Sequence, residues 1–599
     1  MPNRIIQISR RDYRLFFIGI IHMVTLFILS FVALAVRWPL SWATTLAYSS
    51  DTAILTLMAR HFLKGEFSFY YWRAGYYGVL DPILLMGIFK VFGATPATTQ
   101  LLPLFLTPVY LLLFYIYLNQ ISDSWTAIWG TLFLAIPCPY MLFVQFGTYN
   151  YFFGPVLGLL NLILAEKILA RPDERRWSWA FGLAAGFSWY YFRMISFFWG
   201  AIGLRFLFHF YGRKPWDIFL KIKSSLSWKM FYTKVIKLQD WALPSGLKSF
   251  LVFMNKLNLG NLIFAALLWM HGDWESSFHG HRVRISFWDT FRLSLQVGAA
   301  TAFIVYWKAI YRGVPRLWKW PNGRAIICGF LIGYSPALIG SLLGAPPNSP
   351  SQFVSLPVFW NNARLLIMEM VPMMFSTQGA AWQVIAYDLL IGFCACVLMQ
   401  ELWGFFQNLR SSRRIENVPH ALVFLFAINL FLGLWGTQHP DRWTARYYEP
   451  LYLCLALGFA RIVQWAAKKN YLLAATFLVF VLWQQGQSTW RQVRSATRPD
   501  PYEIAAHRLE ELHCRGGYAD YWIAYRLTAF AQEQIIIVPT GDNDRYRPYL
   551  DYVRSLSHVV WLGQSLPSDQ QQVSIKGLSY KVTSQTTIAG LPAVFLDKL

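Results

Sequence analysis

Apolar runs of near-membrane length, separated by more polar segments of varied length, recur along the chain as far as residue 488. A helix needs about 20 consecutive apolar residues to cross the hydrocarbon core of a bilayer. The runs lie at 13–36, 101–118, 125–143, 151–168, 178–192, 194–210, 249–270, 291–309, 325–344, 383–406, 420–437, 449–465 and 471–488. The pattern therefore predicts a polytopic α-helical membrane protein with about 13 spans.

Short runs decide how the spans connect. The runs 178–192 and 194–210 are short enough to form one long helix, but Arg193 favours a tight turn between two spans, because an arginine at mid-membrane is costly. The run 82–93 is apolar but too short to cross, and its length predicts a re-entrant or interfacial helix. Residues 37–100 then form one outward loop, and the sides of all later loops become consistent with their charges.

The composition changes at about Thr489. The stretch 501–513 has helical spacing, and the segments QIIIVP and HVVWLG are typical of short buried strands. YKVTSQTT and PAVFLDK close the chain. We therefore divide the chain into a transmembrane module, 1–488, and a small C-terminal α/β domain, 489–599, on the outer side of the membrane.

Composition supports a membrane protein and excludes other classes. Hydrophobic residues make up 56% of the 599 residues and charged residues 14%, with a mean hydropathy of +0.36, whereas soluble proteins carry about 25% charged residues. A disordered, collagenous or ordinary cytosolic protein is excluded. The formal net charge of +23 would indicate nucleic-acid binding in a soluble protein. Membrane proteins gather Lys and Arg in cytoplasmic loops, so no nucleic-acid partner is expected.

The basic loops predict the orientation. Arg4, Arg10 and Arg11 precede the first span, which places the N-terminus in the cytoplasm. The basic clusters on the same side are Arg171, Arg175 and Arg176; Arg312, Arg316, Lys319 and Arg324; Arg410, Arg413 and Arg414; and Lys468 and Lys469. The basic segment 211–248 is predicted to lie on the anionic leaflet as an amphipathic helix. The outward segments are then 37–100, 144–150, the turn near Arg193, 271–290, 345–382, 438–448 and the C-terminal domain.

The first outward loop carries the candidate chemistry. It contains Asp51 soon after the first span, then Arg60, His61, Lys64 and Arg73, and finally Asp81 at the start of the short apolar helix. Asp51 is a candidate cap for a helix beginning at Thr52, because a Ser/Asp cluster before an apolar-periodic run is a helix-start signal. It is also a candidate general base at the membrane surface, with basic groups nearby for an anionic leaving group. The two interpretations are compatible, since a cap also fixes a carboxylate in place.

The motifs around these residues resemble those of a known group. The early Asp is followed by A-R-H-F-L-x-G (59–65) and by Y-Y-G-x-L-D (76–81) before the short apolar helix. GTYNYFFGP (147–155) occupies an outward turn, and ARYYEPLYLCLALG (445–458) opens a late span. This order resembles the GT-C glycosyltransferases, and it is more narrowly similar to the bacterial relatives of protein O-mannosyltransferases and of the lipid A aminoarabinose transferase.

The resemblance implies an activity, a location and a catalytic residue. Such enzymes lie in the inner membrane of bacteria and use a polyprenyl-phosphate sugar donor, with an acidic residue of the first outer loop as the base. That role falls on Asp51. The aminoarabinose transferase has an acidic residue before proline where this chain has Gly154 and Pro155, and the lysine–proline pair of its first loop is missing here. Asp81 and Arg73 are the candidate replacements.

A departing lipid phosphate lies at headgroup height, so cations at the outer ends of helices are candidate contacts for it. The candidate donor-binding residues are Arg73, Asp81, Arg193, Arg284, Arg446 and Tyr447. The alternative for each arginine is an interface-anchoring side chain that reaches water. The segment HGDWESSFHGH (271–281) matches no strong metal signature, so neither a metal nor another cofactor is expected.

The sequence thus predicts an integral-membrane glycosyltransferase. It moves a sugar from a polyprenyl-phosphate donor to an extracytoplasmic glycan, lipid or protein during cell-envelope glycoconjugate synthesis. The main alternative is a transporter or flippase for a lipid-linked glycan, which should show charges at mid-membrane and two related halves. A third hypothesis is a structural subunit that docks through the C-terminal domain. Among the three, the enzyme hypothesis requires Asp51 or Asp81 for activity.

Overall fold

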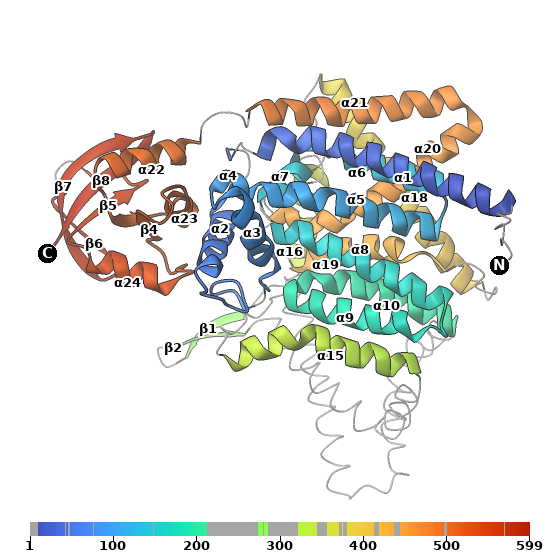
Figure 1. The fold of residues 1–599 in the computed structure, drawn as a ribbon, viewed down its shortest axis with the longest axis horizontal. Coiled ribbons are helices and arrows are strands. Elements are labelled where there is room, and N and C mark those ends of the chain that lie inside the picture. The colour runs from blue at the N-terminus through green and yellow to red at the C-terminus, as the bar shows by residue number, and fades with distance from the viewer. Residues whose placement is uncertain are drawn as a thin grey trace, which may run out of the picture.

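The structure is a computed structural model that describes residues 10–41, 44–45, 48–75, 77–147, 149–212, 274–278, 281–285, 321–343, 356–370, 374, 380–411, 418–436, 444–495, 500–567 and 570–599. Figure 1 shows a bundle of long helices beside a C-terminal domain that is built on one sheet. The short helices α2 (Ser50–Leu63), α3 (Leu80–Phe92) and α4 (Pro96–Thr99) stand between these two parts. The strands β1 (Trp274–Phe278) and β2 (His281–Ile285) form a separate antiparallel hairpin.

The helices of the bundle form where the apolar runs predict them, except α16, which lies within the predicted outward segment 345–382. Their bounds are α1 (Arg10–Arg37), α5 (Leu101–Ile121), α6 (Ser124–Ala135), α7 (Pro139–Gly147), α8 (Tyr149–Ala170), α9 (Arg175–Tyr191), α10 (Ser196–Tyr211), α15 (Pro321–Leu342), α16 (Leu356–Leu365), α18 (Ala381–Arg410), α19 (Ala421–Gly436), α20 (Glu449–Lys469) and α21 (Tyr471–Ser495). In the described ranges, 6 helices are long and apolar enough to cross a membrane, or 7 if a bent pair counts as one span. The predicted runs 249–270 and 291–309 lie outside the described residues, so the figure of about 13 spans stays a prediction.

Prolines and an arginine decide two connections in the bundle. The run 125–143, predicted as one span, is broken into α6 and α7, which are bent by 74°. Pro137 and Pro139 explain the break, because proline has no amide hydrogen and disfavours helical backbone in the residue before it. The predicted tight turn at Arg193 is confirmed, since a 3-10 helix, Arg193–Ile195, separates α9 from α10.

Arg37, the last residue of α1, donates hydrogen bonds to both α6 and α7 inside the bundle. Its side chain is completely buried. Nη1 donates to the main-chain oxygen of Ala135 at 2.8 Å, Nη2 to that of Leu134 at 3.3 Å, and Nε to Oε1 of Gln145 at 3.0 Å. The last carbonyls of a helix lack amide partners in the next turn. Arg37 therefore supplies the donors that α6 loses where it ends.

Replacing Arg37 by methionine should lower the free energy of unfolding by about 1–3 kcal/mol, because the α6 carbonyls then stay buried without donors. Thermal unfolding of the detergent-solubilised protein, followed by circular dichroism, measures the loss. The matched control is Arg171→Met, since the Arg171 side chain is 54% exposed in a surface pair with Glu174. Equal melting temperatures for the two variants would contradict the structural role of Arg37.

The loop predicted to be the first outer one, 37–100, contains the short helices α2 (Ser50–Leu63), α3 (Leu80–Phe92) and α4 (Pro96–Thr99). The run 82–93 forms most of α3, and its 13 residues are too few to cross a membrane, as predicted. A capping box at Thr95 starts α4. α2 packs against α23 of the C-terminal domain, so the first loop joins the two parts of the molecule.

The C-terminal domain is the predicted α/β unit. Its elements are α22 (Pro501–Glu511), β3 (Gly516–Ala519), α23 (Tyr521–Phe530), β4 (Ile536–Pro539), α24 (Arg547–Ser555), β5 (His558–Leu562), β6 (Gln572–Ile575), β7 (Leu578–Ile588) and β8 (Leu591–Lys598). The sheet order is β4-β3-β5-β8-β7-β6. β3 is parallel to β4 and β5, and the remaining pairs are antiparallel. The segments predicted as strands are strands, and α21 continues to Ser495 before the domain begins.

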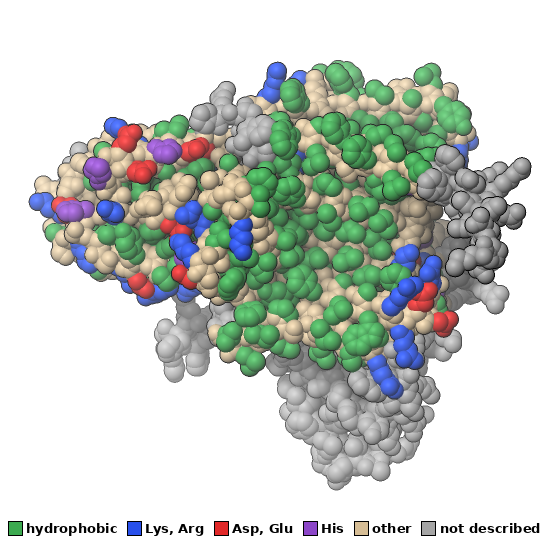
Figure 2. Space-filling model, in the orientation of Figure 1, with side chains coloured by type: hydrophobic (Ala, Val, Ile, Leu, Met, Phe, Trp, Pro, Cys, Tyr) green, Lys and Arg blue, Asp and Glu red, His purple; other side chains and the backbone are tan. Residues whose placement is uncertain are grey.

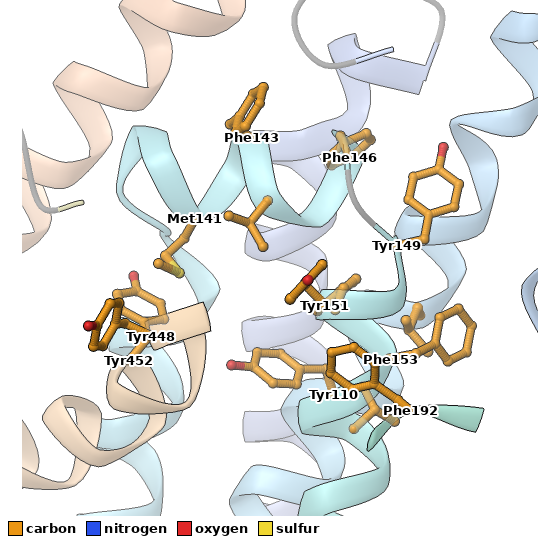
Figure 3. Close-up of a cluster of buried hydrophobic side chains, with 14 of the residues drawn as sticks. Tyr110, Met141, Phe143, Phe146, Tyr149, Tyr151, Phe153, Phe192, Tyr448 and Tyr452 are labelled. Carbon is orange, nitrogen blue, oxygen red and sulfur yellow. The ribbon is translucent and has the colours of Figure 1, made fainter. Parts of the chain in front are cut away.

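The surface and the core suit a helical bundle in lipid. Figure 2 shows hydrophobic side chains spread over the bundle, whereas charged side chains gather on the C-terminal domain and at the opposite end of the bundle. Phe27 and Phe31 of α1 are 73% and 66% exposed, which fits contact with lipid. Inside the bundle, Figure 3 shows Tyr110, Tyr151 and Phe192 gathered at the start of α8. All three rings are buried, and Tyr151 and Phe192 also line the cavity of the candidate site.

Candidate functional site

A cavity of about 850 Å³ lies where the loop 37–100, one end of the bundle helices and the C-terminal domain meet. It is lined by Asp51, Thr52, Leu55, Tyr71, Ala74, Tyr77, Gly78, Asp81, Gly147, Tyr149, Tyr151, Trp189, Phe192, Arg193, Met194, Ser196, Phe197, Arg446, Tyr447 and Arg545. Five of the predicted site residues are in this set: Asp51, Asp81, Arg193, Arg446 and Tyr447. The structure thus brings together residues that are far apart in the sequence.

Asp51 lies in the first turn of α2 and not at its cap. The helix begins one residue earlier than the predicted cap, at Ser50, and the side chain of Ser49 accepts the amide hydrogen of Thr52 as the N-cap. The hydroxyls of Ser49 and Thr52 also donate to the main-chain oxygen of Gly147, at 3.1 and 2.9 Å, which ties α2 to the end of α7. Because Ser49 takes the capping role, the carboxylate of Asp51 is left for other contacts.

The Asp51 carboxylate faces a different residue with each oxygen. The Tyr521 hydroxyl donates to Oδ1 at 2.6 Å, and Nη1 of Arg446 is 4.0 Å from Oδ2. The Tyr71 hydroxyl donates to the main-chain oxygen of Asp51 at 3.0 Å. The Asp51 side chain is 32% exposed. It is therefore held firmly but remains open to the cavity, as a proton acceptor for a substrate must be.

Arg446 lies in a 3-10 helix, Thr444–Tyr448, directly before α20. Its guanidinium carbon is 4.8 Å from the centre of the Tyr151 ring and 5.8 Å from that of Tyr447. Its Nε is buried and has no hydrogen-bond partner among the described residues. The ion pair with Asp51 is long, so Arg446 keeps donors for an anion in the cavity.

Asp81 forms a second carboxyl group in the cavity wall, and it is 2% exposed. The Tyr191 hydroxyl donates to its Oδ1. Burial raises the pKa of Asp81 to about 7, although the hydrogen bond from Tyr191 acts in the opposite direction. Asp81 is therefore partly protonated near neutral pH, and it can donate or accept a hydrogen bond.

Three predicted donor-binding arginines have different positions. The Arg193 guanidinium carbon lies 4.7 Å from the centre of the Trp189 ring at the cavity wall. Arg73 is not part of the lining; it has a φ of 51°, and its Nη1 donates to the main-chain oxygen of Asp544 at 2.9 Å. Arg284 lies in β2 opposite Glu275, and the position of its side chain is outside what the structure describes.

The C-terminal domain adds two residues that sequence reasoning missed, Tyr521 and Arg545. Tyr521 is the first residue of α23, directly after β3 and its helix cap Asp520, and Arg545 lies in the loop that follows β4. β3 and β4 are neighbouring parallel strands, so both residues stand at the carboxyl edge of the sheet. Ligands of α/β sheets bind at this edge. The rule points to the loop after β4, a predicted strand, but β3 was not predicted, so it gave no signal for Tyr521.

No group of three or more His, Cys, Asp or Glu side chains that could hold a metal lies within the part of the chain that the structure describes. The segment 271–281 is described only in part. The expectation that no metal is needed therefore stays a prediction.

A polar cluster fastens the C-terminal domain to α2. His61 has one ring nitrogen 2.6 Å from Glu66 Oε2 and the other 2.9 Å from Glu533 Oε1. Arg60 pairs with Glu533 at 2.9 Å, and the Tyr549 hydroxyl donates to Glu533 at 2.8 Å. Because α2 carries Asp51 and the C-terminal domain carries Tyr521, this cluster helps to set the distance between them.

The docking of the two parts should depend on pH. Burial alone would lower the pKa of His61, but hydrogen bonds to Glu533 and Glu66 raise it above its ordinary value of 6.5. A raised pKa means that His61 stabilises the interface fully below pH 6.5, and that this contribution is lost as the pH rises through the folded-state pKa. Burial would raise the pKa of Glu533, but hydrogen bonds from His61, Arg60 and Tyr549 lower it, so its contribution is present above pH 4.5 and is lost in acid.

We therefore expect docking to be strongest between about pH 4.5 and 6.5 and to weaken toward alkaline pH. Limited proteolysis of the linker between α21 and α22, from about pH 5 to 9, measures docking. His61→Gln should remove the alkaline weakening. The control is His558→Gln, because His558 is 79% exposed on the surface. Identical pH profiles for wild type and His61→Gln would contradict this prediction.

No protein-family model matches this chain, and no curated protein matches it. Among solved structures, it is similar to the apo oligosaccharyltransferase of Archaeoglobus fulgidus, with a TM-score of 0.45 and 12% identity, over 90% of this chain and 69% of that chain. It is also similar to ArnT of Cupriavidus metallidurans bound to undecaprenyl phosphate, with a TM-score of 0.40 and 13% identity, over 95% and 97% of the two chains. At these identities and TM-scores, the similarity assigns no substrate and no residue role. Both neighbours are GT-C glycosyltransferases, the group that the sequence resembles.

Proposed function

We propose that this protein is an integral-membrane glycosyltransferase that moves a sugar from a polyprenyl-phosphate donor to an extracytoplasmic acceptor, a glycan, lipid or protein of the cell envelope. The observation that carries the proposal is the pair of Asp51 and Arg446 in one cavity, 4.0 Å apart. Glycosyl transfer needs a base for the attacking hydroxyl and a cation for the leaving phosphate. Both groups line the wall of this one cavity, which has room for the sugar between the attacking hydroxyl and the leaving phosphate.

In the proposed reaction, the acceptor hydroxyl attacks the anomeric carbon while the bond from that carbon to the phosphate oxygen breaks. Asp51 takes the hydroxyl proton, and Tyr521 holds Oδ1 of Asp51 in place. Arg446 stabilises the charge that develops on the leaving phosphate. Asp81, buried beneath the same cavity, is placed to hydrogen-bond the donor sugar.

The proposal includes a place and an orientation in the cell. The chain lies in a bacterial inner membrane with its N-terminus in the cytoplasm. The cavity and the C-terminal domain then face the outer side, where polyprenyl-phosphate sugars meet their acceptors. The basic loops of the sequence support this orientation.

The direct test uses purified protein in liposomes with a panel of undecaprenyl-phosphate monosaccharides and an envelope extract as the acceptor. Mass spectrometry should detect free undecaprenyl phosphate and a glycosylated product with the wild type, and EDTA should leave the rate unchanged. Movement of an intact lipid-linked sugar across the membrane, without any product, would instead establish the transporter hypothesis. Loss of both activities with every donor would favour a structural subunit.

A further inference from the structure

Arg545 occupies a particular place in the cavity, next to the candidate base. Its guanidinium carbon is 5.9 Å from the centre of the Tyr71 ring and 5.7 Å from that of the Tyr521 ring. The hydroxyls of these two tyrosines donate to Asp51, to its main-chain oxygen and to Oδ1 respectively. Tyr521 thus contacts both the Arg545 guanidinium and the Asp51 carboxylate.

Arg545 has no carboxylate within ion-pair distance among the described residues. The neighbouring acid, Asp544, pairs with Lys576 at 2.5 Å instead. Nη1 of Arg545 donates to the main-chain oxygen of Arg73 over 3.5 Å, and its buried Nε finds no partner within the described parts of the chain. The Tyr521 side chain hydrogen-bonds Arg545, and the more distant Asp51 carboxylate also favours its charge, but no carboxylate of the described residues pairs with it directly. Free guanidinium donors beside a cavity suit an anionic ligand.

Arg545 and Arg446 lie on different sides of Asp51. Oδ2 of Asp51 faces Arg446 of the transmembrane module, and Oδ1 faces Tyr521 of the C-terminal domain, against which Arg545 stands. A donor phosphate at Arg446 leaves Arg545 available for a second group. Because Asp51 must contact the attacking hydroxyl, the acceptor binds beside Asp51, and Arg545 stands next to it against the Tyr521 ring.

We propose that Arg545 binds an oxyanion of a substrate, a phosphate or a carboxylate, in a subsite separate from the one at Arg446. This inference rests on the proposed function for the identity of the neighbouring subsite. The geometry favours the acceptor as the source of the oxyanion, and a donor with a second phosphate is the other source. In either case the C-terminal domain recognises substrate directly.

The test uses the full chain in lipid nanodiscs and three probes: undecaprenyl phosphate, undecaprenyl pyrophosphate, and inorganic phosphate with or without saturating undecaprenyl phosphate. The variant is Arg545→Gln, which keeps a donor for the Arg73 carbonyl. The control is Arg547→Ala, because Arg547 is only two residues away but is 62% exposed in a surface pair with Asp551. Equilibrium dissociation constants are measured for each combination.

Arg545→Gln should bind undecaprenyl phosphate like the wild type but bind inorganic phosphate about 10-fold more weakly in the lipid-saturated protein, which identifies the acceptor subsite. A comparable loss for undecaprenyl pyrophosphate alone identifies a second donor phosphate and supports the same subsite. Arg547→Ala should change neither value.

Unchanged affinity of Arg545→Gln for all three probes would overturn the inference. Melting temperature and protease resistance show whether the variant is folded; if it is not, Arg545→Lys is measured, and wild-type affinities in that variant would overturn the inference equally. Failure of the proposed function looks different. In that case wild-type protein does not bind undecaprenyl phosphate, while its affinity for inorganic phosphate still depends on Arg545.

Discussion

Replacement of Asp51 by asparagine should slow sugar transfer at least about 100-fold while leaving the donor bound. The asparagine amide keeps an oxygen that can accept the Tyr521 hydroxyl, and Ser49 rather than Asp51 caps α2, so the local structure should survive. The amide cannot take the proton of an attacking hydroxyl. Turnover of the wild type and the variant with one undecaprenyl-phosphate sugar, together with their donor dissociation constants, measures both halves of this prediction.

Asp81 provides the matched control, because it is the other carboxyl group of the cavity. Asp81→Asn keeps an acceptor for the Tyr191 hydroxyl and should change turnover much less than Asp51→Asn. The pKa of Asp81, raised to about 7 by burial, would make activity fall below neutral pH if Asp81 were the base. If Asp51→Asn kept near-normal turnover and Asp81→Asn were inactive, the general base would be Asp81 and not Asp51.

The helical part of the fold was predictable because apolar length and basic loops are strong, local signals. The break between α6 and α7 was harder to predict from the sequence. Pro137 and Pro139 were visible in the sequence, but the apolar run continues through them, and hydropathy does not record how a proline bends a helix. The N-cap of α2 was predicted at Asp51 instead of Ser49. Ser49, Ser50 and Asp51 are all good N-cap residues, and only the structure shows which of them begins the helix.

The site was predictable only in part because its residues come from both parts of the chain. Asp51 and Asp81 were candidates from the motifs of the first loop, and Arg193 and Arg446 from their expected height at the outer face. The structure brings all of them into one cavity. The expected height at the membrane surface could not distinguish the cavity arginines from Arg73. Arg73 has the same expected height, but it donates a hydrogen bond to the C-terminal domain. Arg545 and Tyr521 depend on how that domain docks, and no local pattern encodes the docking.

Among the cations of the cavity, Arg446 should contribute most to binding of the donor. It stands 4.0 Å from Asp51, and its buried Nε has no partner within the described residues. A desolvated guanidinium–phosphate pair makes charge-assisted hydrogen bonds in a fixed fork geometry. Arg446→Ala should therefore weaken binding of undecaprenyl phosphate by about 2 kcal/mol or more, which is roughly 30-fold.

Two further variants make the Arg446 prediction specific. Arg446→Lys keeps the charge but loses the planar fork, so its affinity should fall between those of the wild type and Arg446→Ala. Arg73→Ala is the matched control, since Arg73 was an equal candidate by sequence but bonds to the Asp544 carbonyl outside the cavity lining, and its donor affinity should stay near the wild-type value. If Arg73→Ala and not Arg446→Ala lost affinity, the first loop would have to rearrange when the donor binds, and the donor phosphate would lie beside the C-terminal domain. If neither lost affinity, the phosphate would be held elsewhere in the cavity, and Arg193, above the Trp189 ring, would be the next cation to replace.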